Sequence, residues 1–142
     1  MKKQKVLIVE DDLPNLISAF NAIIEIGKNK GIEIEAEGAD TYERFLKMLD
    51  EFKPDIVLSD ATIPEKMGKT PYDFREKIAE ELEKRNIPYI FVTRAPIPGT
   101  HSYNVNIVKK ERGEYKTLKE FNTPEKDKEI WEEAYDLLIN GF

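Results

Sequence analysis

The stretch Lys53-Pro54-Asp55-Ile56-Val57-Leu58-Ser59-Asp60 decides the fold of this chain. Pro54 ends the helical pattern before it, a short apolar run follows, and a carboxylate stands where the run ends. An uninterrupted apolar run is typical of a strand buried on both faces, as in parallel sheets covered by helices. We therefore expect Asp60 at the carboxyl end of a central strand, where such sheets place their working sites.

Strands and helices alternate on both sides of this stretch. Apolar runs predict strands over residues 6–9, 32–36, 56–58, 89–92 and 105–108. Capping patterns predict that helices begin at Asp12 with Pro14, at Asp40 with Glu43 as a capping box, at Thr70 with Pro71, and at Thr123 with Pro124. The alternation predicts an α/β fold with a doubly wound, five-stranded parallel sheet and right-handed crossovers.

The region after the fourth expected strand departs from this pattern. Pro96, Pro98 and Gly99 predict that a fourth helix is reduced or absent. Residues 111–122 are polar without a clear period, and we expect them to form an added segment before the last helix.

Length and composition restrict the class of protein. The chain has 142 residues, 40% of them hydrophobic, which suits one domain over residues 1–142. Its net charge is −6 with interspersed signs, so we expect no direct nucleic-acid partner. It has no cysteine, which excludes disulfides and thiolate sites. The sequence has no apolar stretch long enough to cross a membrane and no signal-peptide pattern, so a cytoplasmic location is expected.

Polar residues that follow the expected strands form the candidate site: Glu10, Asp11, Asp12, Asp60, Thr93, and Lys109 or, as the less favoured choice, Lys110. An acidic pocket with only oxygen ligands favours Mg²⁺. A carboxylate such as Asp60 can attack a phosphoryl group, while a lysine and a hydroxyl neutralise and orient its oxygens. Lys109 and Thr93 are the candidates for those two roles, and Asp12 can equally be a helix cap.

Four segments that carry these residues resemble, in order, the receiver domain of two-component response regulators: KVLIVEDD, PDIVLSDATIPEKMG, IFVT and NIVKK. The resemblance implies a flavodoxin-like strand order 2-1-3-4-5. It implies Mg²⁺ bound by Asp11, Asp60 and the backbone carbonyl of Thr62, with Glu10 as a further acid. It also implies phosphorylation of Asp60 by a histidine kinase, a phosphotransfer protein or a small phosphodonor, with Thr93 and Lys109 assisting.

On this basis we expect a stand-alone receiver that changes its affinity for a downstream protein partner. Its chemistry would be limited to self-phosphorylation and self-dephosphorylation at Asp60, so it would not be an enzyme otherwise. Two alternatives stay open. One is a pseudo-receiver that is not phosphorylated and acts as an interaction module. The other is a Mg²⁺-dependent phosphohydrolase, although the chain has no glycine-rich phosphate loop.

Several residues depart from the family pattern. Arg94 stands where a small residue is usual, and it can either cover the phosphoryl pocket or be a surface cation. Lys109-Lys110 replaces the usual Lys-Pro, and Asn106 replaces the usual aromatic residue. We therefore expect a rebuilt output surface. His101 is expected to be exposed, and Trp131 and Tyr135 are expected to pack in the core.

Overall fold

The computed structural model describes residues 2–141. Its elements follow the chain in this order: β1 (Lys3–Val9), α1 (Leu13–Lys30), β2 (Glu33–Ala39), α2 (Tyr42–Glu51), β3 (Ile56–Ser59), β4 (Thr62–Ile63), β5 (Tyr72–Asp73), α3 (Arg75–Lys84), β6 (Tyr89–Thr93), β7 (Asn106–Glu111), β8 (Glu114–Glu120) and α4 (Lys128–Asn140). No helix among these residues is long and apolar enough to cross a membrane.

The central sheet has six strands in the order β2-β1-β3-β6-β7-β8. The first four are parallel, in the order predicted. The expected parallel fifth strand is wrong, because β7 is antiparallel to β6 and β8 is antiparallel to β7. A parallel connection needs a crossover of a dozen or more residues, usually helical. Residues 94–105 contain no helix, as predicted, so the chain turns back beside β6.

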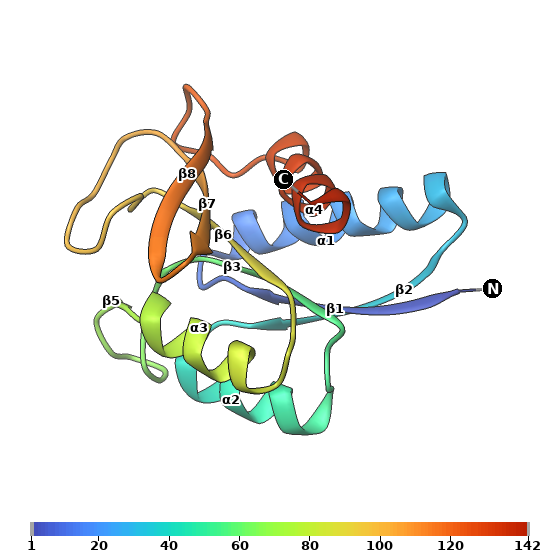
Figure 1. Ribbon diagram of the computed structural model, residues 1–142, viewed down its shortest axis with the longest axis horizontal. Helices are drawn as coiled ribbons and strands as arrows, with labels where there is room; N and C mark the ends of the chain where they lie inside the picture. Colours follow the sequence, from blue (N-terminus) through green and yellow to red (C-terminus); the bar gives the residue numbers. More distant parts are fainter. Residues whose placement is uncertain (1, 142) are drawn as a thin grey trace.

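Helices cover both faces of the sheet (Figure 1): α1 and α4 lie on one face, and α2 and α3 lie on the other. The first face carries a core built from β1, β3, β6, α1 and α4, which includes the fully buried Trp131 and the buried Tyr135. The prediction that these two aromatic residues pack in the core is confirmed. Leu7, Val57 and Phe91 point to the opposite core, under α2 and α3.

Residues 111–122 are a strand in most of their length. β7 and β8 form a hairpin closed by Arg112 and Gly113. Both turn residues have positive φ, 53° and 81°, which is the geometry of the two-residue turn that suits twisted hairpins. The hairpin stays at the sheet edge, where its exposed polar side chains hide the strand pattern.

The starts of two helices differ from the predictions. α2 is capped by Thr41, whose hydroxyl accepts a hydrogen bond from the Arg44 backbone N–H at 3.1 Å, and not by Asp40. α3 begins at Arg75, after the predicted start at Thr70. The residues before it pair as a short antiparallel ribbon, in which β5 lies against β4.

The last helix also begins later than predicted. α4 starts at Lys128, and the side chain of Asp127 caps it by accepting from the Ile130 backbone N–H at 3.1 Å. Residues 121–127 are therefore a connecting loop between β8 and α4. Because β8 runs parallel to β6, this loop starts at the same sheet edge as Asp60.

Candidate functional site

Three carboxylates converge where β1 and β3 end. The two strands are parallel neighbours with Val9 opposite Ser59, and the Asp60 backbone N–H donates to the Val9 carbonyl at 2.8 Å. This register places Glu10 and Asp60 side by side. Ligand oxygens of Glu10, Asp11 and Asp60 all lie within 4.8 Å of one another. The structure thus groups three of the four acids that the sequence singles out, and Asp12 is not part of this group.

The Asp60 carboxylate is held at both oxygens. Its Oδ1 accepts hydrogen bonds from the backbone N–H groups of Ala61, at 2.6 Å, and Thr62, at 3.3 Å. Its Oδ2 lies 2.9 Å from the ammonium nitrogen of Lys126. Local backbone groups and one distant lysine therefore fix the orientation of this side chain.

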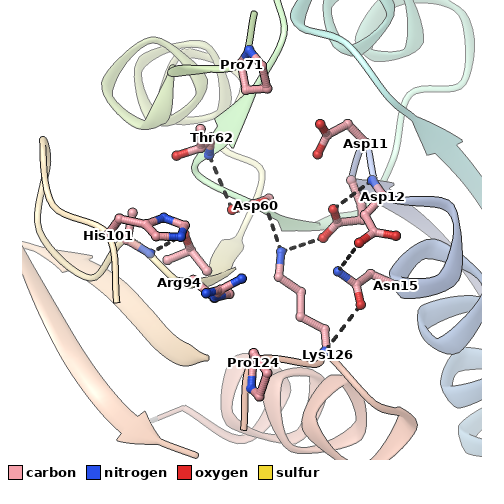
Figure 2. A pocket seen from close by; sticks show the side chains of 13 residues that line it. Asp11, Asp12, Asn15, Asp60, Thr62, Pro71, Arg94, His101, Pro124 and Lys126 are labelled. Carbon is pink, nitrogen blue, oxygen red and sulfur yellow. Dashed lines mark hydrogen bonds and ion pairs between the residues drawn. The ribbon is translucent and has the colours of Figure 1, made fainter. Parts of the chain in front are cut away.

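Lys126 supplies a cation that the sequence analysis does not identify. Its side chain is buried, and its Nζ lies 2.5 Å from Glu10 Oε1 as well as beside Asp60 (Figure 2). Its backbone is anchored too. The Lys126 N–H donates to Asn15 Oδ1 at 3.3 Å, and its carbonyl accepts from the Trp131 indole N–H at 3.1 Å. The loop between β8 and α4 therefore presents Lys126 rigidly to the acids.

Burial and charge shift the protonation of this cluster. Burial is the main cause that raises the pKa of Glu10 to about 7; Asp60 acts in the same direction, and Lys126 partly offsets both. Burial, followed by the charge of Asp60, also raises the pKa of Asp11. Burial disfavours the Lys126 ammonium, but the Asp60 and Glu10 carboxylates outweigh it and raise the pKa of Lys126. Lys126 is therefore a cation at neutral pH.

The structure does not bring Lys109 to this site, so its predicted place beside Asp60 is wrong. β7 begins at the site edge, where Asn106 lies opposite Thr93, and it runs away from that edge. Lys109 lines another cavity, with Glu83 and Pro88. The less favoured Lys110 is also distant, since its Nζ pairs with Glu76 at 2.9 Å. The reversal of strand direction causes both misplacements.

A cavity of about 330 Å³ opens over the acids, and Thr93, Arg94 and His101 line it. The buried Thr93 hydroxyl accepts a hydrogen bond from the Ala95 backbone N–H at 3.0 Å. Arg94 donates through Nε to the Ser102 carbonyl at 3.0 Å. Arg94 and His101 lie across the cavity from Asp11 (Figure 2). His101 is exposed, as predicted, although it also borders the site.

The donor set fits a hard divalent cation. Glu10, Asp11 and Asp60 offer three carboxylate oxygens in close proximity, and Thr62 lines the same cavity. Oxygen ligands of this kind suit Mg²⁺, which commonly uses one or two carboxylates and keeps several waters.

A sequence signal for Lys126 exists, but it is indirect. Arg112-Gly113 separates two runs that can pair as strands, and a hairpin there returns the chain to the edge that bears Asp60. The first loop after that hairpin carries Lys126. Strand direction therefore identifies the lysine, whereas its spacing from Asp60 in the sequence does not.

No family model matches the sequence, and no curated protein matches it. Solved structures do. The RcsB response regulator of Salmonella typhimurium is 12% identical with a TM-score of 0.52, and the match covers 68% of this chain and 44% of that one. The isolated REC domain of RcsB from Salmonella enterica serovar Typhimurium is 12% identical with a TM-score of 0.50, and the match covers 66% and 63%.

The match thus spans less than half of the RcsB response-regulator chain and less than two thirds of the isolated REC domain. At identities this low, the similarity is evidence for a shared fold and for nothing further. The agreement covers the mostly parallel α/β sheet with helices on both faces. This chain has the fold of a response-regulator receiver domain.

Proposed function

We propose that this chain is a signalling receiver that takes a phosphoryl group on Asp60 and thereby changes its affinity for a protein partner. The observation that carries the proposal is the convergence of Glu10, Asp11 and Asp60 around the buried ammonium of Lys126. Glu10, Asp11, Asp60 and the backbone carbonyl of Thr62 would hold Mg²⁺. When bound, this ion would neutralise negative charge on the phosphoryl oxygens.

The Asp60 carboxylate is the nucleophile in this proposal. One of its oxygens forms the new bond to phosphorus as the bond from phosphorus to the donor's leaving atom breaks, and the leaving group keeps that electron pair. A carboxylate offers about four lone-pair positions. Oδ1 accepts from two amides and Oδ2 contacts Lys126, and these contacts hold the carboxylate in one orientation for the attack.

Two further side chains stabilise the charge that develops. Lys126 already contacts Oδ2, so its ammonium is close enough to stabilise negative charge on the phosphoryl oxygens once the bond forms. Thr93 lines the same cavity, and its hydroxyl hydrogen can donate to a phosphoryl oxygen while its oxygen accepts from Ala95. Lys126 takes the role for which the sequence nominates Lys109.

The proposed partners follow from this chemistry. A histidine kinase or a phosphotransfer protein would supply the phosphoryl group, and a downstream protein would recognise the modified state. Hydrolysis of the acyl phosphate at Asp60 would return the receiver to its starting state.

The test is phosphorylation by a small acyl phosphate in Mg²⁺, followed by intact-protein mass spectrometry. We expect one added phosphoryl group in the unmodified chain and none in Asp60→Asn. Asp50→Asn is the matched control, because Asp50 is an exposed carboxylate that pairs with Arg85 on the surface. The control should be phosphorylated like the unmodified chain. Absence of the mass shift with both the small donor and a cognate kinase contradicts the proposal.

A second candidate function is a receiver fold that works as an interaction module without phosphorylation. It is favoured by the bridge from Lys126 to both Glu10 and Asp60, which already neutralises part of the acidic cluster without a metal. Titration with beryllofluoride and Mg²⁺, followed by amide spectra, separates the two. Shifts at residues 60–62 support phosphoryl acceptance, and unchanged spectra support the interaction module.

A further inference from the structure

Arg75, the first residue of α3, is a buried cation outside the acidic cluster. Its side chain is only 2% exposed. Its guanidinium forms two parallel contacts with Asp73, from Nε to Oδ1 at 3.0 Å and from Nη2 to Oδ2 at 2.8 Å. It also donates to the backbone carbonyls of Ala95, at 2.5 Å, and Pro96, at 3.2 Å. A buried charge with so many directional partners is fixed in position.

These contacts join the two walls of the Asp60 cavity. On one side, Asp73 pairs in β5 with Thr62 in β4, and the Phe74 N–H donates to the Ala61 carbonyl at 2.9 Å. Both pairings hold the loop that follows Asp60. On the other side, Ala95 accepts from Arg75 through its carbonyl and donates through its backbone N–H to the Thr93 hydroxyl. Arg75 therefore sets the distance between the loop that follows Asp60 and the loop that follows Thr93.

Arg75 also contacts the hairpin beyond the site. Its guanidinium carbon lies 5.5 Å from the centre of the Tyr115 ring in β8. The Tyr115 hydroxyl donates to Glu76 Oε2 at 2.5 Å, and Lys110 pairs with the other oxygen of Glu76 at 2.9 Å. A displacement of the Ala95 carbonyl would thus move a group that is stacked on the hairpin. The path ends on a partly exposed surface formed by α3, β7 and β8.

The residue beside Thr93 in the neighbouring strand does not connect the Thr93 loop to the hairpin surface. Asn106 lies opposite Thr93, and its side-chain amide donates to the Asn104 carbonyl at 3.0 Å. This hydrogen bond stays between the start of β7 and the loop that precedes it. Among the contacts of the described residues, those of Arg75 link the Thr93 loop to an aromatic side chain near the surface.

We propose that Arg75 is a positioning residue that holds the Thr93 loop against the Asp60 loop and transmits its displacement to Tyr115. The transmission rests on the proposed function, because a phosphoryl group on Asp60 that accepts from the Thr93 hydroxyl would draw the Thr93 loop toward it. The positioning is a property of the unphosphorylated chain and is tested separately.

The first experiment compares Arg75→Met and Arg75→Lys with Arg85→Met. Arg85 is the matched control because it lies at the end of the same helix and pairs on the surface with Asp50 and Glu81. Hydrogen exchange of the Ala95 amide is measured without ligand. We expect roughly tenfold faster exchange in Arg75→Met and no change in Arg85→Met. A lysine ammonium donates from a single nitrogen and cannot form the two parallel contacts that Arg75 makes with Asp73, so Arg75→Lys should also exchange faster. This variant decides the result if Arg75→Met does not fold. Unchanged exchange overturns the positioning role.

The second experiment adds beryllofluoride and Mg²⁺ and follows amide spectra. In the unmodified chain and in Arg85→Met we expect shifts at residues 60–62, at residues 93–95 and at Tyr115. In the Arg75 variants the shift at Tyr115 should be lost while the shift at residues 60–62 remains. Equal shifts at Tyr115 in the Arg75 variants overturn the coupling. No shift at residues 60–62 in the unmodified chain overturns the proposed function and the coupling with it, while the exchange measurement still decides the positioning role.

Discussion

The parallel half of the sheet and its antiparallel edge contribute to the same site in different ways. In the parallel half, Glu10 and Asp60 follow β1 and β3 directly, and the strand register alone brings their carboxylates together. At the antiparallel edge, β7 carries Lys109 away from the site, and β8 returns the chain so that the next loop delivers Lys126. The acids are placed by strand ends, whereas the lysine is placed by a loop.

This difference shows that one electrostatic arrangement can be assembled from different places in the chain. Converging carboxylates repel one another unless a cation lies among them. Any lysine that reaches them through a well-anchored backbone meets this requirement. Lys126 does so with its N–H on Asn15 and its carbonyl on the Trp131 indole.

The largest expected effect comes from replacing Lys126, compared with the same replacement of Lys109. Lys126→Met should remove phosphoryl acceptance and cost about 3–5 kcal/mol of unfolding free energy, because it leaves Glu10 and Asp60 without their buried cation. Lys109→Met should leave acceptance intact, because Lys109 lies on β7 away from the acids. Urea unfolding and mass spectrometry measure the two effects.

The double variant Glu10→Gln with Lys126→Met is the control for stability. It removes a negative and a positive charge together, so part of the lost unfolding free energy should return. If Lys109→Met abolishes acceptance while Lys126→Met retains it, the assignment of the lysine is wrong.

Truncation of one leucine in each half compares their packing. Leu58 in β3 is fully buried, and Leu58→Ala should cost about 2–5 kcal/mol through lost burial and the cavity left behind. Leu118 in β8 is half-buried against the same core, and Leu118→Ala should cost only about 1 kcal/mol. The shift of the urea midpoint reports both. Equal losses would show that the hairpin is as much part of the core as the parallel half.

Mg²⁺ tests whether the converging acids act as one site. A cation that binds only the folded state at about 100 times its dissociation constant adds about 2.7 kcal/mol to the unfolding free energy. We expect Mg²⁺ to raise the melting temperature of the unmodified chain and of Asp50→Asn, and to raise that of Asp11→Asn much less. A melting temperature that is independent of Mg²⁺ would show that Glu10, Asp11 and Asp60 do not bind it.

The smallest effect concerns Glu76 at the antiparallel edge. The hydrogen bond from Tyr115, followed by that from Lys110, lowers the pKa of Glu76 from its usual 4.5. A carboxyl whose folded pKa is lowered stabilises the protein above its unfolded pKa, and this contribution is lost as pH falls through the folded pKa. Glu76 is exposed, so we expect only about 0.5 kcal/mol.

The measurement is the unfolding free energy of the unmodified chain and of Glu76→Gln as the pH is lowered from 7. The difference between the two should shrink as the pH falls below about 4.5, the unfolded value. A difference that grows toward acid pH would contradict the assignment of the Tyr115 and Lys110 contacts to the charged form.

The sequence by itself determined the parallel half and its acids. Short apolar runs buried on both faces predict strands, and a residue that follows such a run must lie at the carboxyl edge. For this reason Glu10, Asp11 and Asp60 could be assigned to one place before the structure was known. The prolines after Thr93 likewise predicted the loss of a helix, since proline has no N–H to donate.

Only the tertiary structure decided the direction of β7 and which lysine lies beside Asp60. Pairing direction depends on which neighbour satisfies the backbone groups of β6, and a polar edge strand such as β8 leaves little apolar pattern in the sequence. Long-range contacts also chose Lys126 over Lys109 and buried Arg75 between two loops. Local sequence determines where a strand ends. Which distant charges come into contact depends on how the whole chain folds.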